Sequence, residues 1–456
     1  MPDVLECRKN VQKEECAIKR NETDPRDRQY EPDPSEQAQK RRKKAKKPNR
    51  GLRVAAVLLT IVLALEGLYC FVVFTDIPAI KSLREAYIET AMNTLSHQWL
   101  AKWFLPSYMI DEVVARQDQA RKDQEGKIST WDKISASDAT DKNGETVAPT
   151  EPTSQTDEER FYELFWELDP DSVDAYVAEH PEAIANGWEK FYVNEAGLDQ
   201  SGTSMISIYD EPVLAIDAEN GVLLLRIQDT GYRGVLAVGK DPAALSIEMC
   251  STLGSCGQLI GTTAEEHDGV LAMNASGFLD PGGNGNGGQL AGYAMSNGEA
   301  HGTHFGAWAY KRIELHEDNL FYIKDANSTV GEGCTDATEF QPAMIIDGVK
   351  YTTDYWTDTQ PRACIGQSDK YEILMLVIEG RYPLDGIVGT SVNTCSDILL
   401  QHGCMQAMNL DGGSSAMMWF DGKYVMQSSS SPLRYSGGRP TPNAWVYKRA
   451  SAITEE

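Results

Sequence analysis

An uninterrupted apolar run is the feature that most restricts how this chain can fold. Residues 54–74 read VAAVLLTIVLALEGLYCFVVF, with Glu66 as the only charged side chain. A helix of about 20 apolar residues is long enough to span the hydrocarbon core of a bilayer. The sequence therefore predicts a transmembrane helix over Val54–Phe74.

The residues before this run predict its orientation. Residues 40–53, KRRKKAKKPNRGLR, are strongly basic, and positive charge collects on the cytoplasmic side of a spanning helix. A cleaved signal peptide is the alternative, but its basic region and apolar core are usually shorter and a small-residue cleavage site follows. We expect an uncleaved anchor of a single-pass plasma-membrane protein, with a disordered cytoplasmic tail at 1–53 and an extracellular C-terminal domain.

The acidic balance of the chain excludes one class of partner. The formal net charge of the 456 residues is −26, whereas nucleic-acid binding requires a basic surface. We expect no nucleic-acid partner. Any phosphate group must be bound locally by individual arginines, because the surface as a whole repels anions.

Composition divides the exported part into four segments. Apolar residues at helical spacing predict a juxtamembrane helical segment at 75–116, and the polar stretch 117–158 is expected to be a flexible stalk. A helical lead-in follows at 159–200 and is interrupted at Asp169-Pro170. Residues 201–450 then form the globular domain.

The pattern of apolar runs and turn residues in 201–450 predicts an α+β domain of mixed or antiparallel sheets with a few helices. Short β-rich runs alternate with Gly/Asp/Asn turns. Asn220-Gly221 between two apolar runs predicts a hairpin. One late helix is expected to be capped by Ser391 and stopped by Gly403.

The cysteines leave two interpretations open. An even number in an exported domain permits disulfides, and Cys250/Cys256 and Cys395/Cys404 are the nearest pairs in sequence. Buried free thiols are equally consistent with the pattern. No C-x-x-C or His/Cys spacing indicates zinc. The six cysteines after the apolar run are Cys250, Cys256, Cys334, Cys364, Cys395 and Cys404.

Several polar motifs interrupt the apolar runs. In NLDGGSS, residues 409–415, two glycines after an Asp allow a tight turn and a close approach to a ligand, and successive amides can bind an anion; an ordinary turn is the alternative. PRACIG places Arg362 at the start of a strand, and VIEGR places Glu379 and Arg381 at the end of the next. Arginine binds phosphate in a bidentate fashion, although a surface ion pair between Glu379 and Arg381 is an alternative.

Two features earlier in the sequence are also candidates for a functional site. An apolar strand ends at Asn274, before a glycine-rich loop that lacks the Gly-Lys-Ser/Thr of a nucleotide-binding loop. His301 and His304 are a candidate metal pair without a recognisable third ligand.

The order of these motifs resembles the phosphodiester glycosidase family. A strand ending in Asn274 is followed by PRACIG, VIEGR, a helix, NLDGGSS and GGRPTPNAWVY. The family includes the enzyme that uncovers mannose 6-phosphate and bacterial proteins labelled exopolysaccharide-biosynthesis proteins; the chain looks like a membrane-anchored bacterial member. Two positions depart from the family pattern, because Ser414 stands where many members have Gly and Glu379 where many have Asp.

The resemblance implies hydrolysis of a sugar-1-phosphodiester at the glycosidic bond of an extracytoplasmic envelope glycan or glycan precursor. Asp411 and Glu379 are the implied catalytic carboxylates, and no metal ligand is assigned, although a divalent cation is left open. There are two alternatives. One is a non-catalytic factor that binds phosphate-containing envelope polysaccharide, and the other is a metal-dependent phosphodiesterase using Asp411, Glu379 and the His301/His304 pair. The implied substrate-binding residues are Asn274, Arg362, Arg381, Asn409, Gly412, Gly413, Ser414, Ser415 and Arg439.

Overall fold

The chain divides into two units, Met1–Cys70 and Phe71–Glu456. Most of the expected cytoplasmic tail, with Cys7 and Cys16, and residues 132–154 of the expected stalk lie outside the part of the chain that the structure describes. The computed structural model describes residues 50–93, 98–131, 155–198, 202–281, 285–305, 310–352, 356–430 and 438–453.

The predicted apolar helix is present. Helix α2 spans Arg50–Phe74 and, by length and composition, is the one described helix that is long and apolar enough to cross a membrane. It begins four residues before the predicted span and includes two of the basic residues that precede it.

Three helices follow in the juxtamembrane segment. Pro78 occupies the first turn of α3, where a missing N–H costs no hydrogen bond. Ile88, Ala101, Ile110 and Val113 form a small core between the three helices. The helices are α3 (Pro78–Met92), α4 (Gln98–Phe104) and α5 (Ser107–Asp123).

The segment after α5 is ordered against the globular part, where the sequence predicts a flexible stalk from residue 117. The Ser129 N–H donates to the Ile323 carbonyl at 3.0 Å, and the Ser129 hydroxyl accepts from the Ile323 N–H at 2.8 Å. The Trp131 indole is 7% exposed and donates to the Phe321 carbonyl at 2.8 Å. One large buried aromatic side chain and paired backbone groups therefore fix a stretch whose composition is otherwise polar.

Several helices border the sheets. The Asp169 side chain accepts from the Ser172 N–H and caps the helix that begins at Pro170, so the predicted break at Asp169-Pro170 is confirmed. Ser391 caps α9 through the Thr394 N–H, and Gly403, at φ +70°, follows its end as predicted. The helices are α6 (Asp157–Leu164), α7 (Pro170–Glu179), α8 (Ile260–Glu266), α9 (Val392–Gln401) and α10 (Ala450–Ile453).

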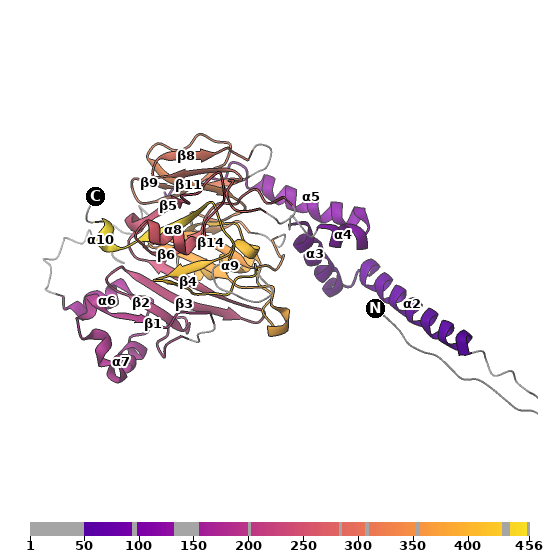
Figure 1. Ribbon diagram of the computed structural model, residues 1–456, viewed down its shortest axis with the longest axis horizontal. Helices are drawn as coiled ribbons and strands as arrows, with labels where there is room; N and C mark the ends of the chain where they lie inside the picture. The colour runs from indigo at the N-terminus through magenta and orange to yellow at the C-terminus, as the bar shows by residue number, and fades with distance from the viewer. Residues whose placement is uncertain are drawn as a thin grey trace, which may run out of the picture. The chain divides into compact units, whose positions relative to one another are not determined.

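The largest sheet has the order β1-β2-β3-β4-β15-β14-β16-β12-β13, and Figure 1 shows β2, β3 and β4 side by side. The predicted hairpin at Asn220-Gly221 joins β2 to β3. The strands of this large sheet are β1 (Tyr192–Asn194), β2 (Val213–Asp217), β3 (Val222–Asp229), β4 (Tyr232–Gly239), β12 (Ala343–Ile346), β13 (Val349–Lys350), β14 (Arg362–Ser368), β15 (Ile373–Ile378) and β16 (Cys404–Asn409).

Two five-stranded sheets complete the domain, with the orders β10-β9-β11-β7-β8 and β18-β17-β6-β19-β5. Their strands are β5 (Leu245–Met249), β6 (Gly269–Asn274), β7 (Tyr293–Ser296), β8 (Glu299–Gly302), β9 (Lys311–His316), β10 (Phe321–Asp325), β11 (Cys334–Phe340), β17 (Met418–Phe420), β18 (Lys423–Tyr424) and β19 (Asn443–Lys448).

The main core lies between the large sheet and the two smaller ones. Leu224 of β3, Phe321 of β10 and Trp445 of β19 belong to one buried cluster. A second cluster packs α6, α7 and α9 on the large sheet, for example through Phe165 and Leu399. All strand pairings in the described ranges are antiparallel. The α+β class with antiparallel sheets is confirmed.

The described cysteines are free, so the disulfide alternative is wrong for both pairs, and the alternative of buried free thiols holds for four of the six. Cys250 is buried while Cys256 is exposed, and Cys395 and Cys404 are both buried as free thiols in the cluster on the large sheet.

Candidate active site

A cavity of about 830 Å³ lies where the interior strands β14 and β16 of the large sheet begin and end, and its volume is within the range of small-molecule sites. Arg362 begins β14, Ile378 ends β15 opposite it, and Asn409 ends β16 beside Cys364. Antiparallel pairing therefore gathers these strand ends and the loops that follow them. The cavity lining includes the predicted residues Arg362, Arg381, Asn409, Asp411, Gly412, Gly413, Ser414, Ser415 and Arg439.

The loop after β16 is shaped by its glycines. Gly413 has φ +59°, and a Cβ there would lie 2.9 Å from the Arg381 guanidinium, so a larger residue would displace that arginine. The Gly413 N–H donates to the Pro361 carbonyl at 2.9 Å, and the Ser415 N–H donates to the Gly412 carbonyl at 3.1 Å. Both amides thus form hydrogen bonds within the protein. Of the four amides at 412–415 that were expected to bind an anion, these two already have acceptors.

Asn274, which the sequence places among the substrate-binding residues, lies outside the cavity lining. Its side chain is fully buried. Its Nδ2 donates to the Asp411 carbonyl at 2.7 Å, and its Oδ1 accepts from the Met417 N–H at 3.1 Å. Asn274 therefore links Asp411 to Met417, on either side of the turn at 412–416.

Asp411 is the carboxyl group that the loop presents to the cavity. Burial raises its pKa from the usual 3.8 to about 6. A hydrogen bond from Ser415 and the charges of Arg439 and Arg381 lower the pKa, whereas the charge of Asp280 raises it. A carboxyl group with such a pKa is ionised at neutral pH and remains basic enough to accept a proton.

The three cavity arginines that the sequence analysis predicted differ in how their charges are compensated. Arg362 forms an ion pair with Asp358 at 3.0 Å. Arg439 forms one with Asp280 at 2.8 Å. Within the described part of the chain, Arg381 instead donates to the Gln360 amide oxygen at 3.1 Å. Arg381 is therefore the arginine best able to bind a phosphate group.

Glu379 lies outside the cavity lining, contrary to its predicted catalytic place. Its carboxylate is fully buried, and the Arg233 guanidinium donates to it at 2.7 and 3.1 Å. Burial raises the pKa of Glu379, and Arg233 lowers it. The ion pair considered between Glu379 and Arg381 is not formed, because Arg233 pairs with the Glu379 carboxylate and the Arg381 guanidinium donates to Gln360.

The structure adds residues that the sequence reasoning missed. Asp280, Tyr310 and Gln360 line the cavity. Asp280 follows a buried segment and precedes Pro281 and a run of glycines. This position in the sequence indicates a loop that can border a ligand site, so it marks Asp280 as a candidate. Tyr310 carries no comparable signal, because only the fold brings it near Asp411.

The predicted metal pair is not part of this cavity. His304 contacts the Glu339 carboxylate through Nδ1, and its ring stacks on Tyr293 with centroids 4.7 Å apart. His301 lies on β8. Neither histidine lines the cavity with Asp411, so the arrangement required by the metal-dependent alternative is not formed.

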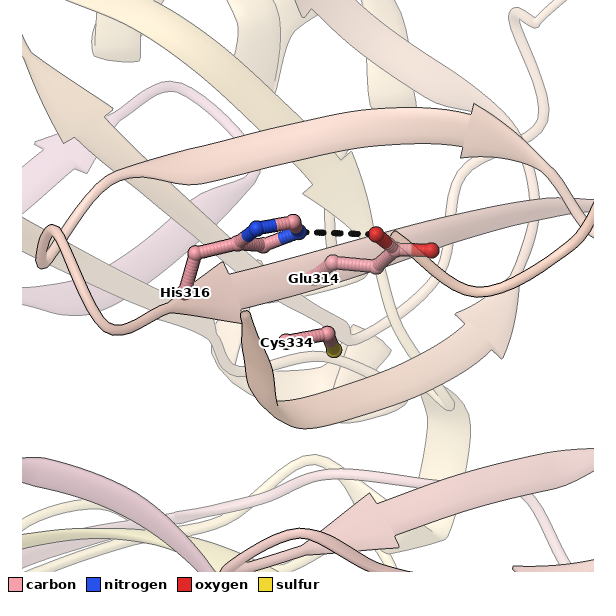
Figure 2. A group of neighbouring side chains, drawn as sticks. All are labelled: Glu314, His316 and Cys334. Atoms are coloured by element: carbon pink, nitrogen blue, oxygen red, sulfur yellow. Dashed lines mark hydrogen bonds and ion pairs between the residues drawn. The ribbon is translucent and has the colours of Figure 1, made fainter. Parts of the chain in front are cut away.

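Another cluster brings together three residues of the kinds that bind metals. Glu314 and His316 of β9 and Cys334 of β11 place their ligand atoms within 4.8 Å of one another (Figure 2). The Glu314 carboxylate already contacts His316 Nε2 at 2.8 Å and the buried Arg312 guanidinium at 2.7 Å. Arg312 compensates the charge of Glu314, so the cluster is accounted for as a buried polar network without a cation.

Comparison with known proteins places this site in a family. Residues 267–448 match the family model of phosphodiester glycosidases. Residues 267–448 belong to the phosphodiester glycosidase family. This phosphodiester glycosidase segment contains every predicted site residue, from Asn274 to Arg439.

Solved structures that match part of this chain include the following two. The catalytic domain of zebrafish N-acetylglucosamine-1-phosphodiester α-N-acetylglucosaminidase, auto-inhibited by its pro-peptide, is 16% identical, with 58% of this chain and 90% of that chain covered at a TM-score of 0.42. A hypothetical protein from Synechocystis is 14% identical, with 52% and 63% covered at a TM-score of 0.38. A comparison with curated proteins yields no significant match.

Proposed function

We propose that the domain hydrolyses a sugar-1-phosphodiester at the glycosidic bond and releases a free sugar and a phosphomonoester. The observation that carries this proposal is the juxtaposition of Asp411 and Arg381 in one cavity. Membership of residues 267–448 in the phosphodiester glycosidase family supports the reaction class.

The chemistry requires little from a general acid. Water adds its oxygen to the anomeric carbon, the bond from that carbon to the phosphate oxygen breaks, and the electron pair leaves with the phosphomonoester. A phosphate monoester is a good leaving group, so the protein must mainly bind phosphate and stabilise an oxocarbenium-like transition state. Arg381 binds the phosphate, and Asp411 in its ionised form acts as base toward water or as nucleophile.

The remaining cavity residues hold this pair in place. Arg362 and Arg439 contribute positive potential, although Asp358 and Asp280 compensate much of their charge. Asn409 is proposed to contact sugar hydroxyl groups, with its Nδ2 anchored to the Gln341 carbonyl at 2.7 Å.

We further propose that the domain works outside the plasma membrane on an envelope glycan or glycan precursor. The length and apolar composition of α2 support an anchor, and the basic residues before it support a cytoplasmic N-terminus. The 25-residue span needs no partner helix to cross a bilayer.

Turnover by the full-length chain in detergent tests the reaction. The name of the zebrafish protein suggests the first probe, the methyl phosphodiester of N-acetylglucosamine 1-phosphate. We expect release of free sugar and methyl phosphate with and without EDTA, and loss of at least about 1,000-fold in kcat for Asp411→Asn. The control is Asp397→Asn, since Asp397 is an exposed carboxylate paired with Lys350 on the surface.

Two results would contradict the proposal. A folded protein that releases no sugar from a panel of sugar-1-phosphodiesters would favour the binding factor. Full activity of Asp411→Asn would remove the catalytic role of the loop.

A further inference from the structure

The cavity wall includes residues that lie outside the phosphodiester glycosidase segment. Arg121 of α5 and Asn93, which caps the C-terminus of α3, are among the lining residues. Both belong to the helical segment between the apolar helix α2 and the globular domain. The juxtamembrane helices are thus part of the site.

Specific contacts attach this segment to the cavity-lining loop. The Glu89 carboxylate of α3 accepts from the Thr357 N–H at 3.2 Å and from the Thr357 hydroxyl at 2.9 Å. Thr357 lies between Trp356 and Asp358, and both of these line the cavity. On the other side, Gln124 Nε2 donates to the Ala343 carbonyl at 3.1 Å. The helices are therefore fixed to the domain by buried polar contacts and not only by the chain connection.

Arg121 is held in a defined place. Its side chain is 9% exposed, its Nη1 contacts Asp118 at 2.7 Å, and its guanidinium carbon lies 5.7 Å from the Trp356 ring centroid. Buried arginine side chains are usually paired with a carboxylate, and the partner of Arg121 is Asp118, whose side chain is 43% exposed. Tyr310 also lines the cavity. Burial raises its pKa, the nearby charge of Arg121 lowers it, and the charge of Asp411 raises it.

Arg381 and Arg121 contact different residues of the cavity lining. Arg381 adjoins Gly413 of the catalytic loop, where the scissile phosphate must lie. Arg121 lies in a wall that also contains the aromatic residues Trp356, Tyr310 and Phe340. A cavity of about 830 Å³ is at the upper end of the range for ligand sites, so it has room for a group beyond the sugar and its phosphate.

We propose that Arg121 and the juxtamembrane helices form a subsite for an aglycone that carries a second anionic group, such as another phosphate. The proposal rests on the function proposed above and names its substrate class. Arg121 binds the anion, while the aromatic side chains contact the apolar part of the aglycone. The glycosidase segment supplies the reaction, and the juxtamembrane segment supplies the selectivity.

A matched pair of substrates tests the subsite. The full-length chain in detergent is given the ethyl and the 2-phosphoethyl phosphodiesters of N-acetylglucosamine 1-phosphate, which differ by one phosphate. We expect wild type to favour the 2-phosphoethyl ester in kcat/KM. In Arg121→Gln this preference should fall by about 10-fold, as expected for loss of a charge-assisted contact.

The control is Lys122→Gln, which removes the same charge from the next, exposed position of α5. Its preference should equal that of wild type. Arg121→Lys should recover part of the preference, because it restores the charge without the fork geometry. Thermal unfolding of each variant shows whether α5 remains docked.

Separate results contradict each proposal. An unchanged preference in folded Arg121→Gln, or equal losses with Lys122→Gln, would overturn the subsite while leaving hydrolysis intact. If wild type hydrolyses neither ester, calorimetry decides: tighter binding of the 2-phosphoethyl ester that depends on Arg121 would keep the subsite and remove the reaction. Equal binding of both esters would overturn the subsite as well.

Discussion

The ionisation of Asp411 should set the fall of kcat/KM on the acid side of the pH profile. Neutralising Asp280 and neutralising Arg439 should shift this fall in opposite directions. Phosphodiesters stay ionised far below pH 5, so the substrate does not titrate in this range. With a pKa of about 6 for Asp411, kcat/KM at pH 5 should be roughly a tenth of its plateau and rise through pH 6.

The two neighbours act on this pKa with opposite signs. Asp280 raises the pKa of Asp411, and Arg439 lowers it. Asp280→Asn removes the negative charge and also releases Arg439 from its 2.8 Å ion pair, so both changes lower the pKa. Arg439→Gln removes the positive charge and leaves Asp280 uncompensated, so both changes raise it. We expect shifts of about 0.5 to 1 pH unit in each direction.

The assay is kcat/KM between pH 4.5 and 8.5 for wild type and both variants, with Asp397→Asn as a control for surface charge. Shifts of the two variants in the same direction would refute the electrostatic reasoning. A rate that falls as pH rises through 6 would refute the ionised form of Asp411 as the active one, because it would make this carboxyl group an acid.

Three other changes have defined outcomes. Asn274→Ala leaves the Asp411 carbonyl and the Met417 N–H without their partner, so it should lower the free energy of unfolding by on the order of 3 kcal/mol and reduce kcat; normal thermal stability would contradict this role. Burial raises the pKa of Glu89 from 4.5 to about 7, so the folded state takes up a proton between these values and stability falls as pH rises through that window. Glu89→Gln should flatten this dependence and stabilise the protein at pH 8 by at most about 3 kcal/mol, as melting curves at pH 5 and pH 8 would show. Cobalt(II) added to the full-length chain should give no thiolate-to-metal absorption band from Cys334; such a band would show that the cluster binds a metal.

Local sequence signals predicted much of the site because they lie at strand ends. Arg362, Arg381 and the loop after Asn409 each follow or precede a short apolar run. Antiparallel pairing of those runs places them together. Periodicity and turn residues report this kind of information directly.

The differences between the predicted and the observed positions share another cause. The sequence places Glu379 among the candidate catalytic carboxylates because it does not show that Arg233 lies opposite it, across neighbouring strands from distant parts of the chain. Asn274 ends a strand as predicted, but its partners are backbone groups of another loop. Arg121 resembled part of a charged stalk, and only tertiary packing places it in the cavity wall.

The bond that breaks is the most direct test of the central claim. Hydrolysis of the methyl phosphodiester of N-acetylglucosamine 1-phosphate in ¹⁸O-labelled water, followed by mass spectrometry of both products, locates the incoming oxygen. Attack at the anomeric carbon predicts the label in the sugar and none in methyl phosphate. Because free sugars exchange this oxygen slowly, the sugar is analysed at early times. Label in a phosphate product would show cleavage at phosphorus and contradict the assignment as a glycosidase.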